Sequence, residues 1–323
     1  MRTTFAAGLR WARNHSLLAA VALAGVWTAI GYLWAAAAHA SADFVQEWWR
    51  LFGTIDIGLG VWLLLDAETH PLPVLLDGLA SSPLSSRTAA RLKWTIVAAV
   101  ALIGSGSLIA LGFHVPAAML PFMWTTCLLI CAISGVVTWH GVEVLLASKH
   151  IGESQLHVFV YSPGETKQLR AFARHVTQFA ALCTIGYAIT LCGTLLARWT
   201  APPAHVEQVV TFWPLLYVPF CLLLLIYPQI QFRTIIRREK QKLLDMCQSK
   251  IDDLLQKPDL TNDDVAKCNA FADFFEKITK TPDFVLDAPI VLRMLSIVLV
   301  NAFTLFVPKD LLLQWLQLYA SRL

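Results

Sequence analysis

The sequence is poor in charge. Asp, Glu, Lys and Arg make up 15% of its 323 residues, whereas hydrophobic residues make up 57%. An ordinary soluble domain has about 25% charged residues, so this composition excludes a soluble globular protein. The formal net charge of +3 is too small to indicate a nucleic-acid partner. The balance is typical of an all-α protein whose helices form a polytopic transmembrane bundle.

The chain also lacks the short motifs of common catalytic and cofactor sites. It contains no phosphate-binding P-loop motif, no GxGxxG turn, no HExxH zinc motif, no CxxC pair and no GxSxG nucleophile elbow. An ATP-driven transporter with this sequence would need its motor on another polypeptide. We therefore expect a non-enzymatic protein with no cofactor and no bound metal.

Cysteine is missing from the loops that are expected on the outer side of the membrane. Two of the seven cysteines, Cys247 and Cys268, lie in a charged segment, and the other five lie in long apolar runs, at positions 127, 131, 183, 192 and 221. This distribution requires no disulfide bond.

Long apolar runs are what the chain has instead. Windows of about 20 apolar residues, the length of a membrane-spanning helix, mark seven segments: 16–38, 45–65, 93–112, 120–142, 175–197, 209–227 and 289–307. The second is the weakest of the first six, and the seventh has a re-entrant hairpin as its alternative.

Ala38-His39-Ala40 resembles a signal-peptidase site, but the run before it is long enough to span, so we favour a retained span over a cleaved signal peptide.

Basic residues are concentrated on one side of these segments. With the N-terminus in the cytoplasm, the outer loops contain only Arg50 and Arg198, and the inner ones hold most other Lys and Arg. The positive-inside rule then predicts a multi-pass protein of the cell inner membrane. We expect a bundle over 1–228, a cytoplasmic helical hairpin over 229–287 and a C-terminal membrane segment over 288–323.

The charged segment 229–287 has the pattern of two antiparallel helices. Apolar residues recur every three to four positions at Ile236, Leu243, Cys247, Ile251 and Leu254, with Lys240 as the polar interruption. Pro258 ends this helix, the acidic run to Asp264 starts the next one, and Pro282 follows its end.

The apolar stripe of the predicted hairpin has two interpretations. It packs only within the hairpin, or it belongs to a docking surface for a cytosolic protein or a second copy of the chain. The residues assigned to that surface are Arg237, Arg238, Leu243, Ile251, Phe271 and Phe275.

Asp56 lies near the middle of the second predicted span. A carboxylate at that depth costs at least about 2.5–3.5 kcal/mol, so it must be protonated, paired or hydrated. Gly53 and Gly60 share its helix face and favour the close approach of another helix. Other polar groups at comparable depth are Ser105, Ser107, Thr184 and Tyr187. These groups form either a polar path centred on Asp56 or hydrogen bonds that only hold the bundle together.

His140 and Glu143 lie three residues apart near the inner end of the fourth span, and His175 lies at the inner end of the fifth. Imidazole and carboxylate groups bind metals and transfer protons. The three residues therefore form a candidate metal or proton site, and the alternative is a set of polar side chains that reach the membrane interface.

Together these patterns favour an oligomeric transport or permeability unit in the lipid bilayer, controlled through its cytoplasmic hairpin. One alternative is a membrane scaffold whose hairpin recruits a cytosolic partner. A second is a membrane-embedded enzyme that uses His140, Glu143 or Asp56.

Overall fold

The structure, a computed structural model, is helical in the part of the chain that it describes. That part comprises residues 15–39, 41, 50–69, 86–110, 117–153, 158–159, 166–196, 203–256, 259, 261–283, 285, 288–306 and 314. Its elements are α2 (Ser16–Ala37), α4 (Arg50–Thr69), α6 (Ser86–Ala110), η1 (Ala117–Met119), α7 (Leu120–Glu153), α8 (Lys167–Leu196), α9 (Pro203–Leu255), α10 (Asn262–Lys280) and α11 (Ala288–Phe306). No strand occurs among these residues, which confirms the predicted all-α class.

Four of these helices contain stretches long and apolar enough to cross a membrane: Ser16–Ala37, Arg87–Gly106, Leu120–Glu153 and Tyr217–Leu255. Large apolar side chains on α2 and α6, including Leu18, Leu33, Leu102 and Ile103, are each more than half exposed. Apolar surface of this extent is unfavourable in water but suits a lipid surrounding. The helices are therefore those of a membrane protein.

The helices extend beyond several of the predicted spans. α7 continues past Val142 to Glu153, α8 begins at Lys167 ahead of His175, and α9 runs without interruption through Pro228 to Leu255. The predicted boundary between bundle and hairpin at 228/229 thus falls inside one helix. A hydropathy window detects only the bilayer-length apolar part, whereas an established helix continues wherever its backbone and one packed face allow.

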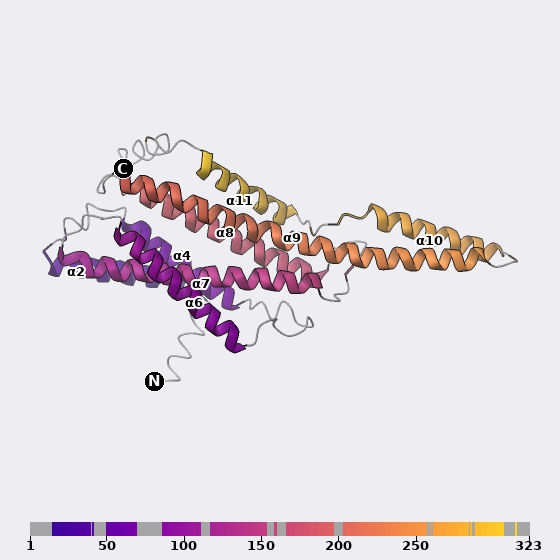
Figure 1. The fold of residues 1–323 in the computed structure, drawn as a ribbon, viewed down its shortest axis with the longest axis horizontal. Coiled ribbons are helices and arrows are strands. Elements are labelled where there is room, and N and C mark those ends of the chain that lie inside the picture. Colours follow the sequence, from indigo (N-terminus) through magenta and orange to yellow (C-terminus); the bar gives the residue numbers. More distant parts are fainter. Residues whose placement is uncertain are drawn as a thin grey trace.

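Four helices form the centre of the bundle (Figure 1). α4 and α9 each pack against both α7 and α8, so α7 and α8 face each other across the bundle interior. α8 runs antiparallel to α9, because Tyr187 stacks on Tyr217 and Phe172 meets Phe232 edge-on. The main apolar core lies between α7, α8, α9 and α11, with Val176, Leu224 and Ile236 fully buried.

Glycines allow close contact at several helix crossings. A Cβ on Gly60, predicted to be a packing position, would lie 2.3 Å from Ile133 Cγ2 of α7. A Cβ on Gly135 of α7 would lie 2.8 Å from Val97 Cα of α6. Such contacts fix both the rotation and the register of neighbouring helices. The surroundings of Gly53 lie outside the described residues.

The C-terminal part of α9 and α10 form an arm that projects from the bundle (Figure 1). The Thr261 side chain accepts a hydrogen bond from the Asp264 backbone N–H, and the Asp264 carboxylate accepts one from Thr261 N. This capping box starts α10 where the acidic run predicted a helix. Cys247 and Ile278 are fully buried in the arm, and Cys247 belongs to the predicted apolar stripe of the first arm helix.

The last described helix, α11, turns back from the arm and lies along the bundle (Figure 1). It packs mainly against α8, with Ile290 and Ile297 buried. Its opposite face exposes Leu292, Leu295 and Leu299. α11 is therefore apolar both on its protein-facing side and on its outer side.

Candidate functional site

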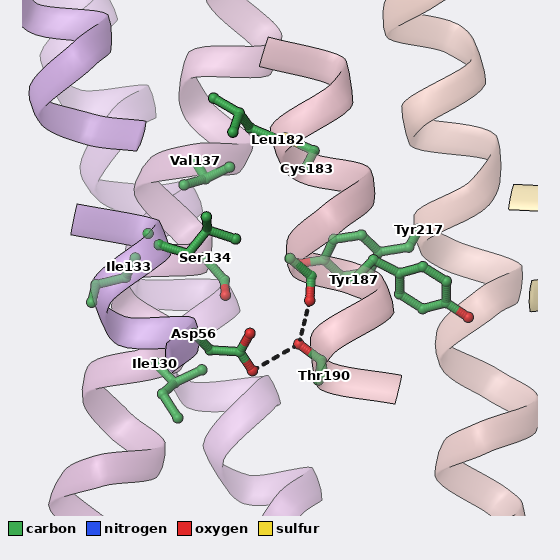
Figure 2. Close-up of a pocket in the computed structure, with 13 residues that line it drawn as sticks. Asp56, Ile130, Ile133, Ser134, Val137, Leu182, Cys183, Tyr187, Thr190 and Tyr217 are labelled. Atoms are coloured by element: carbon green, nitrogen blue, oxygen red, sulfur yellow. Dashed lines mark hydrogen bonds between the residues drawn. The ribbon is translucent and has the colours of Figure 1, made fainter. Parts of the chain in front are cut away.

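Asp56 of α4 faces the interior of the four-helix bundle (Figure 2). Its Oδ2 accepts a hydrogen bond from the Thr190 hydroxyl of α8 at 2.9 Å, and the same hydroxyl lies 2.9 Å from the Gly186 carbonyl. A hydroxyl has only one hydrogen to donate. Both contacts are fully satisfied when the Asp56 carboxyl group is protonated and donates to Thr190 Oγ1, which then donates to Gly186.

A cavity of about 60 Å³ adjoins Asp56 and is lined by α4, α7, α8 and α9. Its polar side chains are Asp56, Ser134, Tyr187, Thr190 and Tyr217, and most other lining residues are apolar. A water molecule needs about 10–15 Å³ of such space and two to four polar partners. The cavity therefore has room for a few water molecules beside the carboxyl group.

Tyr187 and Tyr217 connect two walls of this cavity. Their rings stack with centroids 5.5 Å apart and planes inclined by 17°. Tyr187 comes from α8 and Tyr217 from α9, so the pair links the cavity to the helix that continues into the arm (Figure 2). The sequence drew attention to Tyr187 but not to Tyr217, because a single tyrosine in an apolar run carries no signal of what it faces.

Two other residues predicted to join Asp56 have different neighbours. Ser105 lies on α6, donates to the Ala101 carbonyl of its own helix and does not line the cavity. Thr184 of α8 is buried and donates to the Ala180 carbonyl, also within its helix. The structure does not bring Ser105 to the cavity beside Asp56, since α6 packs against α7 and not among the four helices that line it. The side chain of Ser107 lies outside the described residues.

A second polar group lies further along the same bundle interior. His140 Nε2 of α7 is 3.2 Å from His175 Nε2 of α8, and His140 Nδ1 is 3.4 Å from Glu143 Oε2. The Trp139 indole N–H donates to the other carboxylate oxygen, Glu143 Oε1, at 2.6 Å. The edge-to-face contact with Phe179 (centroids 4.8 Å apart) further restricts the His140 ring. The structure thus brings together the three residues that the sequence grouped.

These three side chains are suited to proton transfer. A hydrogen bond between two imidazole nitrogens requires one of them to carry the hydrogen and the other to accept it. Among the described residues, no set of three or more His, Cys, Asp or Glu side chains is arranged to hold a metal ion.

No protein-family model, curated protein or solved structure matches this chain. Its function is therefore argued from its own residues.

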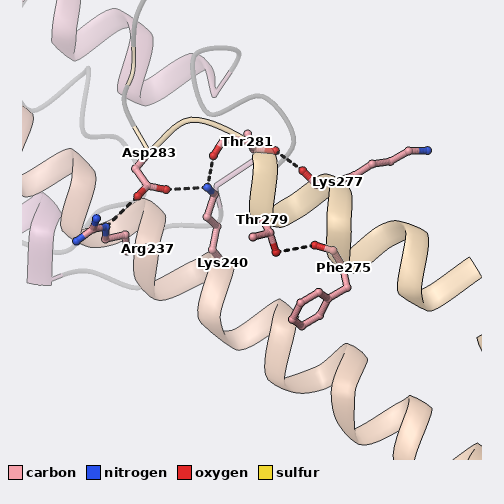
Figure 3. Close-up of polar contacts among 7 residues, drawn as sticks. All are labelled: Arg237, Lys240, Phe275, Lys277, Thr279, Thr281 and Asp283. Atoms are coloured by element: carbon pink, nitrogen blue, oxygen red, sulfur yellow. Dashed lines mark hydrogen bonds and ion pairs between the residues drawn. The ribbon is translucent and has the colours of Figure 1, made fainter.

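The base of the arm contains a charge cluster around the buried Lys240 that the sequence did not predict (Figure 3). Lys240 Nζ of α9 lies 2.7 Å from Asp283 Oδ1 and donates to the Thr281 carbonyl, and Arg237 Nε donates to Asp283 Oδ2 at 2.9 Å. We call Arg237, Lys240 and Asp283 the clasp. It ties the segment after α10 back onto α9.

The residues predicted for a docking surface are largely engaged within the chain. Arg237 belongs to the clasp, and Arg238 donates to the Gly152 carbonyl of α7 at 3.0 Å. Leu243, Ile251 and Phe271 are half-buried, whereas Phe275 and the two arginines are exposed. The half-buried apolar residues favour the interpretation in which the stripe packs only within the hairpin.

Proposed function

We propose that this protein is a multi-pass inner-membrane transport or permeability unit whose central bundle carries an ion or small polar solute past Asp56. The observation that carries this proposal is the placement of the half-buried Asp56 beside a partly polar cavity that four helices line. Ionisable residues at membrane depth that face a bundle interior are characteristic of substrate and ion pathways.

The alternative, in which Asp56 forms a hydrogen bond that only holds the bundle together, explains less of this arrangement. One hydrogen bond between Asp56 and Thr190 would hold α4 to α8 without any space beside it. Well-packed interiors contain few voids larger than a water molecule. A cavity of about 60 Å³ with five polar side chains is more easily understood as a place for a small polar species.

The proposed topology has seven crossings, with α4, α8 and α11 added to the four longest apolar stretches. α8 runs antiparallel to α9 and packs along it, so a membrane that α9 crosses would be crossed by α8 as well. α11 lies along α8 with an apolar outer face, which supports a span rather than a re-entrant hairpin. The N-terminus and the arm are proposed to lie in the cytoplasm.

Control through the arm is supported by the continuity of α9. One helix carries Tyr217 in the cavity wall and Lys240 in the clasp. A movement of the arm can therefore reach the cavity along one continuous helix, in which Pro219 and Pro228 lie between the two sites. The homo-oligomer and the cytosolic partner of the arm stay predictions.

The proposal is tested with the full-length protein purified in detergent and reconstituted into liposomes. Fluxes of K⁺, Cl⁻ and H⁺ are measured with ion-sensitive dyes for the wild type, Asp56→Asn and the control Asp253→Asn. Asp253 is an exposed aspartate of the arm. We expect flux that Asp56→Asn abolishes and Asp253→Asn leaves unchanged, because asparagine keeps the shape but not the ionisable group. Wild-type vesicles no leakier than empty ones, or full flux through Asp56→Asn, would overturn the proposal.

A further inference from the structure

The contact between His140 and His175 lies in the interior of the central bundle, between helices that face each other across it. Glu143, the neighbour of His140 on α7, has 42% of its side chain exposed, whereas His140 has 11% exposed. The group therefore leads from a partly exposed carboxylate through the buried His140 to the half-buried His175.

The hydrogen-bond partners determine which ring nitrogen of each histidine carries the hydrogen. An ionised carboxylate only accepts, so Glu143 favours the tautomer of His140 in which Nδ1 carries the hydrogen. His140 Nε2 is then an acceptor, and His175 Nε2 must donate to it. Trp139 keeps the Glu143 carboxylate in place by donating to its other oxygen.

This chain can pass one proton without gaining or losing any. A proton that binds His175 Nδ1 allows the hydrogen on His175 Nε2 to move to His140 Nε2. The hydrogen on His140 Nδ1 then moves to Glu143, which releases it to water. The transfer leaves both imidazoles in the opposite tautomer, so each ring exchanges its hydrogen with water before the next proton passes.

The same group is close to the cavity beside Asp56. Val137 lines that cavity and lies one helical turn before His140 on α7. Ser134, a polar lining residue, lies about 9 Å from His140 along the helix axis. Water molecules in the cavity can carry a proton along the part of the distance from Ser134 to His140 that lies within the cavity.

Ions larger than a proton are poorly suited to this route. The two imidazole nitrogens are in direct hydrogen-bond contact, Phe179 lies against the His140 ring, and Phe220 of α9 fills the space over Gly141. A hydrated cation would have to separate these side chains, whereas a proton moves by exchange of hydrogen bonds. Of the described titratable groups, Glu143 on α7 and His175 on α8 are those in contact with His140.

We infer that the species conducted through the bundle is the proton, and that His175, His140 and Glu143 carry it between the Asp56 cavity and the cytoplasmic side. This inference rests on the proposed function, because it names the ion that passes Asp56.

The experiment uses liposomes that contain the full-length protein and a trapped pH-sensitive dye, with a K⁺ gradient and valinomycin to set the membrane potential. Proton flux is compared for the wild type, His140→Gln, His175→Gln and the control His150→Gln. His150 lies on the same helix α7 but is not in contact with the pair. We expect the first two variants to lose proton flux by about tenfold or more, because a positioned proton-transfer group is removed, and the control to keep it.

The outcomes separate this inference from the proposed function. Wild-type proton flux through both His140→Gln and His175→Gln overturns the relay. Flux of K⁺ or Cl⁻ that depends on Asp56, without proton flux, also overturns it while leaving the transport function in place. If a histidine variant fails to fold, the proton flux of the wild type is compared in H₂O and D₂O. A relay predicts a markedly slower flux in D₂O. A flux unaffected by D₂O contradicts the relay.

Discussion

Lys240 of α9 lies 2.7 Å from Asp283, although only 7% of the lysine is exposed. A buried ammonium group is tolerated because one carboxylate oxygen and the Thr281 carbonyl accept its hydrogens. Lys240, the polar interruption in the apolar stripe, is therefore the point at which the chain after α10 is attached to α9.

Removing the clasp carboxylate should loosen the arm. Asp283→Asn leaves the Lys240 ammonium buried without a counter-charge, at a cost of about 3 kcal/mol. We expect amide hydrogen exchange in α10 to become faster by roughly a hundredfold, since each 1.4 kcal/mol is about tenfold. Glu239→Gln is the matched control, because Glu239 pairs with the exposed Lys242 and the loss of such a pair costs at most about 1 kcal/mol. Equal exchange rates in the two variants would contradict the role of the clasp.

The clasp should also open in acid. The hydrogen bond from Lys240 holds the pKa of Asp283 below its ordinary value of 3.8, with a smaller contribution from Arg237 and partial burial acting in the opposite direction. A depressed pKa in the folded state stabilises the clasp above the ordinary pKa, and this stabilisation is lost as the pH falls through the folded-state value. The clasp is therefore expected to be constant between pH 7 and 5 and to weaken below about pH 4.

Spin labels on the exposed residues Gln248 and Asn269 report this opening as a broader distance distribution between α9 and α10. The distribution should broaden in acid for the wild type. In the Asp283→Asn background it should already be broad at neutral pH and lack this titration. A wild-type distribution unchanged at pH 3 would show that Asp283 does not hold the arm.

The crossing of α6 and α7 depends on Gly135. A Cβ there would lie 2.8 Å from Val97 Cα and 3.2 Å from the Val97 carbonyl oxygen, and backbone atoms cannot move aside as a side chain can. Gly135→Ala should lower the thermal stability of the protein in detergent, by about 1–3 kcal/mol. Gly25→Ala is the control, because no atom lies within 4 Å of its added Cβ, and alanine is the better helix former. A loss of stability in both variants would argue against the specific crossing.

The proposed topology is checked with single cysteines in a cysteine-free variant and a membrane-impermeant maleimide. Gln248→Cys in the arm should react only after the inner membrane is permeabilised, and Thr200→Cys should react from the outer side. Because α11 is proposed as a seventh span, Ser321→Cys should react from the same side as Thr200→Cys. Reaction of Gln248→Cys from the outer side would reverse the orientation, and protection of Ser321→Cys would mean that α11 does not cross.

Local features of this fold could be predicted because they depend on neighbours in the chain. The apolar runs predicted the helical membrane class, and the cap at Thr261 and the end of α10 before Pro282 followed from residues adjacent in sequence. The grouping of His140 with His175 could also be anticipated, since both were placed at similar depth on their helices. Helix ends outside the apolar windows were missed, because a hydropathy window responds to lipid-length runs and not to helix continuity.

Composition and periodicity by themselves determined that this chain is helical, apolar on most helix surfaces and folded back on itself after Pro258. Only the tertiary structure decided that Asp56 meets Thr190 beside a cavity, that Ser105 lies away from it, and that Lys240 binds Asp283. The physical reason is that contacts between helices depend on their rotation and axial register. Both are set by how small residues such as Gly60 and Gly135 let neighbouring helices pack, which no property of a single helix specifies.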